Sequence, residues 1–151
     1  MRALKKNNIK TVIDTSATYI DEYTEDIIDE AQMLLLDIKH SDYEKFAEIA
    51  GCPQDKLLEM IELINDCGTP VWVRQVIVPG INDTEENIKA LAEFINKSLD
   101  NVYKVELLGY HTMALNKYEK LGMKYKLDGV KAMDKKKLAK LQKTLNEYLE
   151  Q

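Results

Sequence analysis

The chain has 151 residues, the length of one domain, with 45% hydrophobic and 31% charged residues, as in an ordinary folded protein. Its formal net charge of −5 argues against a general nucleic-acid binder. The sequence contains no apolar stretch long enough to cross a membrane, and its first residues do not lead into the apolar core of a signal peptide. We therefore expect a single domain over residues 1–151 in the cytoplasm, with neither a membrane nor a nucleic acid as partner.

Short apolar strands alternate with amphipathic helices along the chain. Residues 1–6 are typical of the last turns of a helix. Strands are then predicted at residues 11–15, 33–38, 70–78 and 102–109, and helices at residues 23–31, 41–50, 53–66, 83–99 and 134–149. This alternation predicts an α/β fold with parallel strands and right-handed connections. Because the first strand has a neighbour on one side only, we expect a further segment upstream of it.

Three local signals add detail to this outline. The nearly continuous apolar run at residues 33–38 favours a strand that is covered on both faces. Asp83, followed three positions later by Glu86, predicts a capping box at the start of a helix. Residues 110–130 are predicted to be mostly loop, anchored by three tyrosines at positions 110, 118 and 125.

Cys52, Cys67 and Trp72 are assigned to the structure rather than to a site. The two cysteines are far apart in the sequence and have no close partner. A thiolate metal site needs three or four soft ligands at short spacing. We therefore expect both cysteines to be structural thiols, and we expect the tryptophan to lie in the core.

Polar side chains gather where the predicted strands end. They are Asp14 and Thr15 on the first strand, Asp37 and Lys39 on the second, and His111 after the fourth; the third strand carries Arg74 along its length and ends at Pro79-Gly80. In parallel α/β folds, functional residues lie at the carboxyl ends of the strands. Asp37 and Lys39 are two positions apart and point to the same side of the sheet, where they can hold a charged ligand. Asp14 and Asp37 can also share a hard cation through oxygen ligands.

Each of these residues also has an ordinary structural explanation. Asp37 and Lys39 can form a plain salt bridge, and Arg74 can pair with a neighbouring carboxylate. Asp14 can cap the helix that follows, and His111 can bond to the backbone of a loop. The sequence has no phosphate-binding glycine loop, nucleophile elbow or zinc motif. Pattern alone therefore ends at an α/β domain with a polar site at its strand ends.

Taken in order, the strand ends resemble those of a known family, the pyruvate formate-lyase activating enzymes. The similar segments are Ile13-Asp14-Thr15, Leu36-Asp37-Ile38-Lys39, Trp72-Val73-Arg74, Val78-Pro79-Gly80-Ile81-Asn82-Asp83, Glu106-Leu107-Leu108-Gly109-Tyr110-His111, Lys117-Tyr118 through Leu121-Gly122, and Tyr125-Lys126-Leu127-Asp128-Gly129-Val130. The resemblance runs over nearly the whole chain. Its most specific part is the Tyr-His segment together with the Tyr-Lys-Leu-Asp-Gly segment.

The resemblance implies a partial (β/α) barrel, the last four strands of a radical-SAM (β/α)6 barrel with outer helices. In that family an N-terminal three-cysteine motif holds a [4Fe–4S] cluster, which binds S-adenosylmethionine. Reductive cleavage of S-adenosylmethionine gives a 5′-deoxyadenosyl radical, which takes a hydrogen from a glycine of pyruvate formate-lyase. A flavodoxin-type protein is the implied electron donor. The protein's own part is to position the cofactor.

The resemblance also implies roles for individual residues. A cation site matches Asp14, Thr15, Asp37 and the backbone carbonyl of Leu35. S-adenosylmethionine is expected to face Asp37, Lys39 and His111. The substrate peptide is expected to face Lys39 and Arg74.

The sequence departs from the family pattern in several places, and two of these departures bear on the site. The three-cysteine motif is missing, so the chain alone is predicted to be inactive, with no catalytic residue and no iron–sulfur ligand. Ala17 stands where the family commonly has glycine, so the loop after Asp14 is expected to differ. Two other functions stay open. One is a non-catalytic binding module, or half of a split activase, that binds a glycyl-radical enzyme; the other is activation of a different glycyl-radical enzyme.

Overall fold

The computed structural model describes residues 1–149, and for residues 114–116 it describes the backbone only. Its elements are α1 (Arg2–Lys6), β1 (Val12–Thr15), α2 (Thr24–Glu30), β2 (Met33–Asp37), α3 (Tyr43–Ala50), α4 (Asp55–Cys67), β3 (Val71–Ile77), α5 (Glu85–Ser98), β4 (Val102–Gly109), the 3-10 helix η1 (Thr112–Ala114), α6 (Leu115–Lys120) and α7 (Lys135–Leu149). The four strands form one parallel sheet in the order β1-β2-β3-β4. The predicted α/β class with four parallel strands is confirmed.

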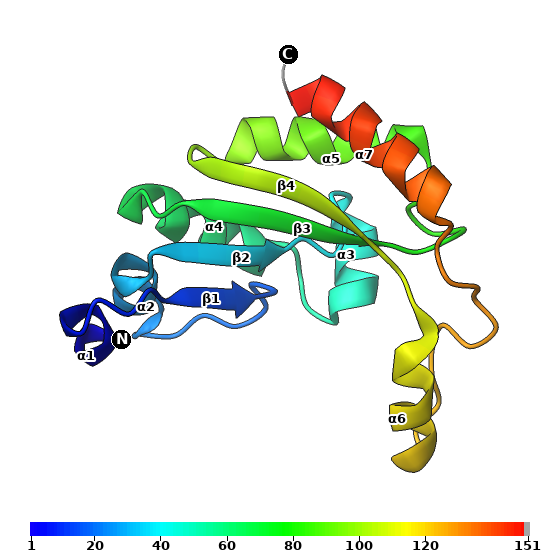
Figure 1. The fold of residues 1–151 in the computed structure, drawn as a ribbon, viewed down its shortest axis with the longest axis horizontal. Coiled ribbons are helices and arrows are strands. Elements are labelled where there is room, and N and C mark those ends of the chain that lie inside the picture. The colour runs from blue at the N-terminus through cyan, green and yellow to red at the C-terminus, as the bar shows by residue number, and fades with distance from the viewer. Residues whose placement is uncertain (150–151) are drawn as a thin grey trace.

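Side chains alternate between the two faces of the sheet along each strand. The helices cover only one of these faces, and the other is open. Leu34 and Leu36 of β2 are fully buried beneath the helices, as is Val73 of β3. Leu35 and Arg74, which point to the opposite face, are only half-buried. Figure 1 shows α4 behind the strands, α5 and α7 side by side beyond β4, and α6 projecting below the end of β4. The prediction that β2 is covered on both faces is therefore wrong for residues 1–149; we call its open side the inner face.

Two helical predictions are corrected by the structure. Helix α5 begins at Glu85, and its N-cap is Thr84, whose hydroxyl accepts a hydrogen bond from the backbone N–H of Asn87. The capping box predicted at Asp83 and Glu86 does not form, because Asp83 instead bonds the turn before it. The stretch predicted as mostly loop after β4 contains η1 and α6.

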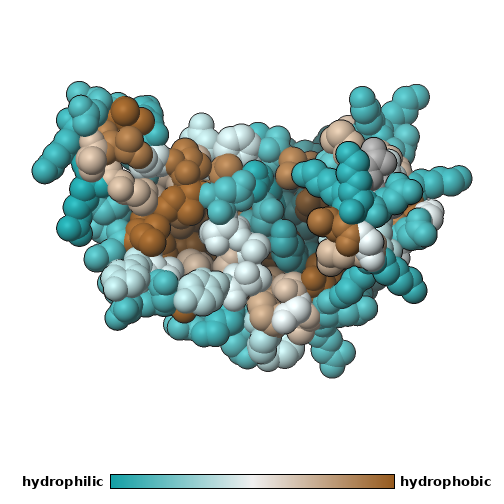
Figure 2. All heavy atoms as spheres, turned by 90° about the horizontal axis from the view of Figure 1, so that it is seen from below, coloured by the Kyte–Doolittle hydropathy of each residue, from teal (hydrophilic) through white to brown (hydrophobic). Residues whose placement is uncertain are grey.

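Strand β1 lies at one edge of the sheet and pairs only with β2 within the described residues. Leu4, Ile9 and Val12, along α1 and β1, are exposed apolar side chains. Figure 2, which views the molecule from below, shows hydrophobic surface gathered on this side, at the left. None of the helices in residues 1–149 combines the length and the apolarity needed to cross a membrane.

Ala17, in the loop after β1, adopts a backbone conformation that favours glycine. Its φ is 55°, and its side chain is completely buried. The loop was expected to differ from one built on glycine, yet the alanine takes the left-handed conformation. That conformation costs a non-glycine residue about 1–2 kcal/mol, and the buried methyl group returns about 0.8 kcal/mol.

Ala17→Gly is therefore expected to change the free energy of unfolding by less than about 1 kcal/mol. Ala31 is the matched control, because it is also buried but has an ordinary φ of −78°. Ala31→Gly loses the methyl group without relieving strain, and it is expected to cost about 1.5 kcal/mol. Urea unfolding of both variants measures the difference; equal losses would show that Ala17 is unstrained.

Candidate functional site

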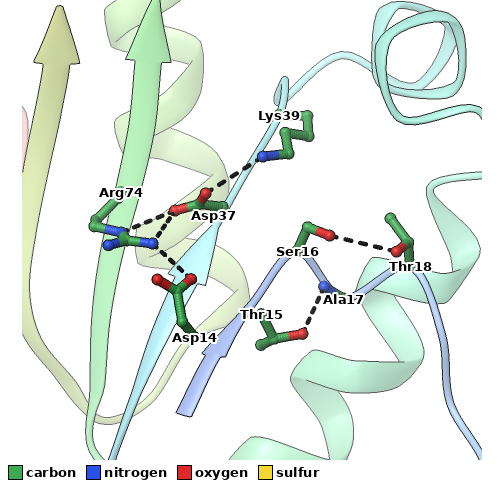
Figure 3. A network of polar contacts seen from close by, with 8 residues as sticks. All are labelled: Asp14, Thr15, Ser16, Ala17, Thr18, Asp37, Lys39 and Arg74. Atoms are coloured by element: carbon green, nitrogen blue, oxygen red, sulfur yellow. Dashed lines mark hydrogen bonds and ion pairs between the residues drawn. The ribbon is translucent and has the colours of Figure 1, made fainter. Parts of the chain in front are cut away.

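Four predicted site residues, Asp14, Asp37, Lys39 and Arg74, meet on the inner face, near the C-terminal ends of β1 and β2 and beside the middle of β3 (Figure 3). The Nε of Arg74 donates to Asp37 Oδ1 at 2.8 Å, and its Nη2 donates to Asp14 Oδ1 at 2.7 Å. Lys39 Nζ donates to the other oxygen of Asp37 at 3.3 Å. Sheet register brings Asp37 directly beside Arg74. The result is a chain of alternating charges across three strands.

Arg74 is the centre of this network. Its side chain is 18% exposed, compared with 23% for Asp37 and 60% for Asp14. Burial by itself lowers the pKa of Arg74, but the hydrogen bonds to Asp14 and Asp37 raise it above its ordinary value. The guanidinium is therefore permanently charged and pairs with both carboxylates, while Lys39 supplies the second positive charge. The structural explanations proposed for Asp37, Lys39 and Arg74 are confirmed, whereas Asp14 does not cap α2, which has Tyr23 as N-cap without a side-chain cap.

The other predicted site residues lie apart from this network. Thr15 follows Asp14 directly, so its side chain points to the other side of the strand, and its hydroxyl accepts a hydrogen bond from Ala17 N–H at 3.0 Å. Leu35 lies inside β2, between Asp14 on one neighbouring strand and Trp72 on the other. His111 is exposed beyond the end of β4. The structure thus assembles the charged residues and leaves the Thr15 hydroxyl out.

Further along the inner face, three more polar or aromatic residues follow the same alternation. Trp72 lies two residues before Arg74 on β3, and the Nζ of Lys104 lies 4.2 Å from the centre of its ring. Lys104 pairs with Glu106 at 3.0 Å, and Glu106 lies beside Arg74 in the sheet register. The assignment of Trp72 to the core is wrong, because odd-numbered β3 residues face the helices and even-numbered ones face inward. The alternation of buried and less buried positions along β3 and β4 is the sequence signal that would identify Trp72, Lys104 and Glu106 as inner-face residues.

The Val-Pro-Gly-Ile-Asn-Asp segment forms a tight turn at the end of β3. Asn82 bonds the backbone at two points, accepting from Val78 N–H at 2.7 Å and donating to Val76 C=O at 2.9 Å. Asp83 accepts from Gly80 N–H at 2.8 Å, and Gly80 has a φ of 79°, which only glycine adopts freely. The asparagine and aspartate of this motif therefore hold the backbone that follows the site strand.

Asp83 also makes a charge-assisted hydrogen bond to Lys137 of α7, and this bond lowers the pKa of its carboxyl. Because the folded-state pKa lies below the unfolded value of about 3.9, the carboxylate stabilises the fold above that pH. Its contribution is lost as the pH falls through the lowered folded-state pKa. Asp83→Asn is therefore expected to cost about 1–3 kcal/mol at pH 7.

The measurement is urea unfolding of Asp83→Asn and of the unchanged protein between pH 7 and pH 2.5. The difference in free energy should shrink below about pH 4, where the Asp83 carboxyl of the unfolded state takes up a proton, and should be lost below the lowered pKa of the folded state. Glu93→Gln, on the exposed face of α5, serves as control and should show little change. A difference that stays constant down to the lowest pH would contradict the ion-pair explanation.

His40 lies close to the network in sequence but is enclosed. It is 2% exposed, and its Nδ1 accepts a hydrogen bond from the backbone N–H of Asp42. Burial lowers its pKa, and nearby Lys45 lowers it further. It borders a hollow of about 610 Å³ between α3 and α5, on the helical side of the sheet. His40 therefore holds the start of α3 and belongs to the scaffold around the inner-face site.

Comparison with known proteins agrees with the resemblance seen in the sequence. No family model matches the sequence. The chain is 43% identical over 150 residues to the pyruvate formate-lyase-activating enzyme of Clostridium pasteurianum, covering 99% of this chain and 62% of that protein. The corresponding enzyme of Staphylococcus epidermidis is 39% identical over 139 residues, covering 88% of this chain and 55% of that protein. The chain thus spans between 55% and 62% of the length of these two curated relatives.

Solved structures match the fold. A domain of pyruvate-formate lyase-activating enzyme from Bacteroides vulgatus has a TM-score of 0.72 at 21% identity, covering 95% of this chain and 80% of that one. A radical SAM methyltransferase from Sphaerobacter thermophilus has a TM-score of 0.67 at 12% identity, covering 94% of this chain and 40% of that one. At these identities the likeness establishes the architecture, part of a radical-SAM barrel, and nothing about ligands.

Proposed function

The chain belongs to the family of pyruvate formate-lyase-activating enzymes, and on this premise we propose that it is the C-terminal part of an enzyme that generates a glycyl radical on pyruvate formate-lyase. The observation that supports the proposal is the 43% identity over 99% of the chain. The inner-face network lies where such an enzyme would need to hold charged ligands, at the carboxyl ends of parallel strands. In the whole enzyme, a [4Fe–4S] cluster and S-adenosylmethionine would supply the radical chemistry.

The cysteines of this chain do not fit the cluster. Cys52 precedes α4 and Cys67 ends it, so they lie roughly 20 Å apart along that helix. Burial raises the pKa of Cys67, and the nearby Asp29 raises it further, which disfavours the thiolate that iron requires. The cluster ligands must therefore come from residues outside this chain, and we propose that the chain alone is inactive.

Lys39 and Asp37 are the residues best placed to contact S-adenosylmethionine or the substrate peptide. The side chain of Lys39 is 32% exposed, just beyond β2. An ammonium group has three donors, and one bonds Asp37, so two are available for a ligand carboxylate or a peptide carbonyl. His111 would complete the cofactor contacts from the end of β4, and Arg74 would contact the peptide from β3.

A hard cation fits the pair of carboxylates on the inner face. Asp14 and Asp37 are oxygen ligands, and a positively charged guanidinium already bridges them. The carbonyl of Leu35 and the backbone of Thr15 are the other proposed ligands, since the Thr15 hydroxyl is turned toward Ala17. We propose that this cation organises the carboxylates and takes no part in the chemistry.

Anaerobic reconstitution with iron and sulfide tests whether the cluster ligands lie outside this chain. The chain alone should bind no stoichiometric [4Fe–4S] cluster. A chimera that adds the N-terminal part of the Clostridium pasteurianum relative should bind the cluster, cleave S-adenosylmethionine and give a glycyl-radical EPR signal on pyruvate formate-lyase. A chimera that folds and holds its cluster but leaves pyruvate formate-lyase unchanged, while activating another glycyl-radical enzyme, would transfer the proposal to that enzyme.

The second candidate function is a binding module, or half of a split activase, that recognises a glycyl-radical enzyme. The free donors of Lys39 on an open face favour it. The chain should then co-purify with pyruvate formate-lyase, and Lys39→Ala should abolish retention. Lys89→Ala, on the outer helix α5, is the matched control. A flavodoxin-type electron donor and a cytoplasmic location are further proposals that follow from the family.

A further inference from the structure

We propose that Arg74 and a hard cation are alternative occupants of one position between Asp14 and Asp37, so that cation binding requires Arg74 to leave. This inference rests on the cation site proposed above. It adds that Arg74 is an internal competitor, and that its own availability for a ligand is coupled to the cation.

The geometry of a single nitrogen atom carries the proposal. Arg74 Nη2 lies 2.7 Å from Asp14 Oδ1 and 2.8 Å from Asp37 Oδ1, so one atom bridges the two carboxylates (Figure 3). A calcium-sized cation that binds the same two oxygens would lie about 2.3–2.6 Å from each. The nitrogen and the cation would then occupy nearly the same point. The two states exclude each other sterically as well as by charge.

The charges at the network indicate which cation would replace Arg74. With Arg74 seated, Asp14 and Asp37 are balanced by Arg74 and Lys39, since Lys39 holds the second oxygen of Asp37. When Arg74 leaves, two carboxylates and one ammonium remain, with a net charge of −1. A monovalent cation restores neutrality, whereas a divalent one leaves an excess positive charge on a partly buried face. The charge balance therefore favours a monovalent competitor over a divalent one.

The displaced guanidinium would stay on the inner face. Arg74 lies beside Asp37 on one side and beside Glu106 on the other in the sheet register. Once freed from the two aspartates, its planar donor group is available to a carboxylate or peptide carbonyl presented to this face. Cation binding thus releases an anchor for the substrate. The apparent affinity for the cation is the intrinsic affinity multiplied by the fraction of molecules in which Arg74 has left the two aspartates.

The single tryptophan makes the competition measurable in the chain as it stands. Trp72 is two residues from Arg74 on the same face of β3, a spacing of about 7 Å along the strand. Tb³⁺ carries more charge than neutrality requires, so it serves only as a luminescent probe of the oxygen ligands. Where it binds, excitation of this tryptophan at about 295 nm should sensitise its emission. Titration of Tb³⁺, followed by displacement with K⁺ or Na⁺ at constant ionic strength, gives the dissociation constants.

We expect Arg74→Gln to bind at least about tenfold more tightly than the unchanged protein. Lys39→Gln is the matched control: it removes a positive charge from Asp37 but leaves the bridging position filled, so its affinity should change much less. Arg74→Lys, which keeps the charge but lacks the fork, should lie in between. A second readout, thermal melting, should show stabilisation by K⁺ or Na⁺ in Arg74→Gln and not in the unchanged protein, and it also confirms folding.

Three results would overturn the inference. Equal affinities for the unchanged protein and Arg74→Gln would show that Arg74 does not compete. Equal gains in Arg74→Gln and Lys39→Gln would reduce the effect to general electrostatics. The absence of sensitised Tb³⁺ and of monovalent stabilisation in folded Arg74→Gln would remove the cation site itself, while glycyl-radical formation by the chimera would still support the proposed function.

Discussion

In the chimera with the N-terminal part of the Clostridium pasteurianum relative, Asp37→Asn is expected to reduce glycyl-radical formation by about 100-fold or more. Asp37 holds Arg74 with one oxygen and Lys39 with the other. Asparagine keeps one acceptor and replaces the second with a donor, so it cannot hold both cations. Lys39 then loses its fixed position, and displacement of a positioning group by about 1 Å is enough for a loss of this size.

The measurement is the EPR amplitude of the glycyl radical on pyruvate formate-lyase as a function of time, with cluster content determined for each variant. Asp66→Asn is the control, because Asp66 is exposed on the outer helix α4. Cluster content should be the same in both variants, since neither substitution removes a cysteine thiolate. Activity within about threefold of the unchanged chimera would exclude Asp37 from any positioning role.

The sequence was sufficient to predict that the charged residues meet, but not how they pair. Parallel strands bring their carboxyl ends to one edge, which places Asp14 near Asp37. Arg74 lies inside β3, where the sheet register places it beside Asp37. The pairing depends on reach: Arg74 spans β2 entirely to bond Asp14 on β1, a contact between residues 60 positions apart. No local sequence pattern predicts a contact between residues so far apart in the chain. The opposite orientation of Thr15, by contrast, follows from the alternation of side chains along a strand, although the resemblance groups Thr15 with Asp14.

The start of α5 shows why the helix cap was misplaced. Asp83 and Thr84 are adjacent, and both residue types are good N-caps. The preceding turn decides between them: Gly80 N–H needs an acceptor, and Asp83 supplies it. Lys137 on α7 then engages the second oxygen. Because Asp83 bonds Gly80 and Lys137, Thr84 is the N-cap of α5. Lys137 lies more than 50 positions away in the sequence, so the local segment alone does not predict this choice.

Because the two faces of β2 differ in burial, truncation of its neighbouring leucines is expected to lower the free energy of unfolding by unequal amounts. Leu36 is fully buried between the sheet and its helices, whereas Leu35 is half-buried on the inner face. Leu36→Ala removes well-packed methyl groups and leaves a cavity, so it is expected to cost about 2–5 kcal/mol. For a domain whose total stability is about 5–15 kcal/mol, that is a large fraction. Leu35→Ala opens no closed cavity and is expected to cost about 1 kcal/mol or less.

Urea unfolding of the two variants tests whether the inner face is open in this chain. The pair is closely matched, since the residues are adjacent, chemically identical and in the same strand, and both substitutions keep the backbone carbonyl of Leu35. Equal losses would mean that something covers the inner face in solution, for example a second copy of the chain, and the loss for Leu35→Ala would then depend on protein concentration. In the chimera, where added strands would close the barrel, the loss for Leu35→Ala should rise toward that of Leu36→Ala, because burial of the same side chain would then be complete.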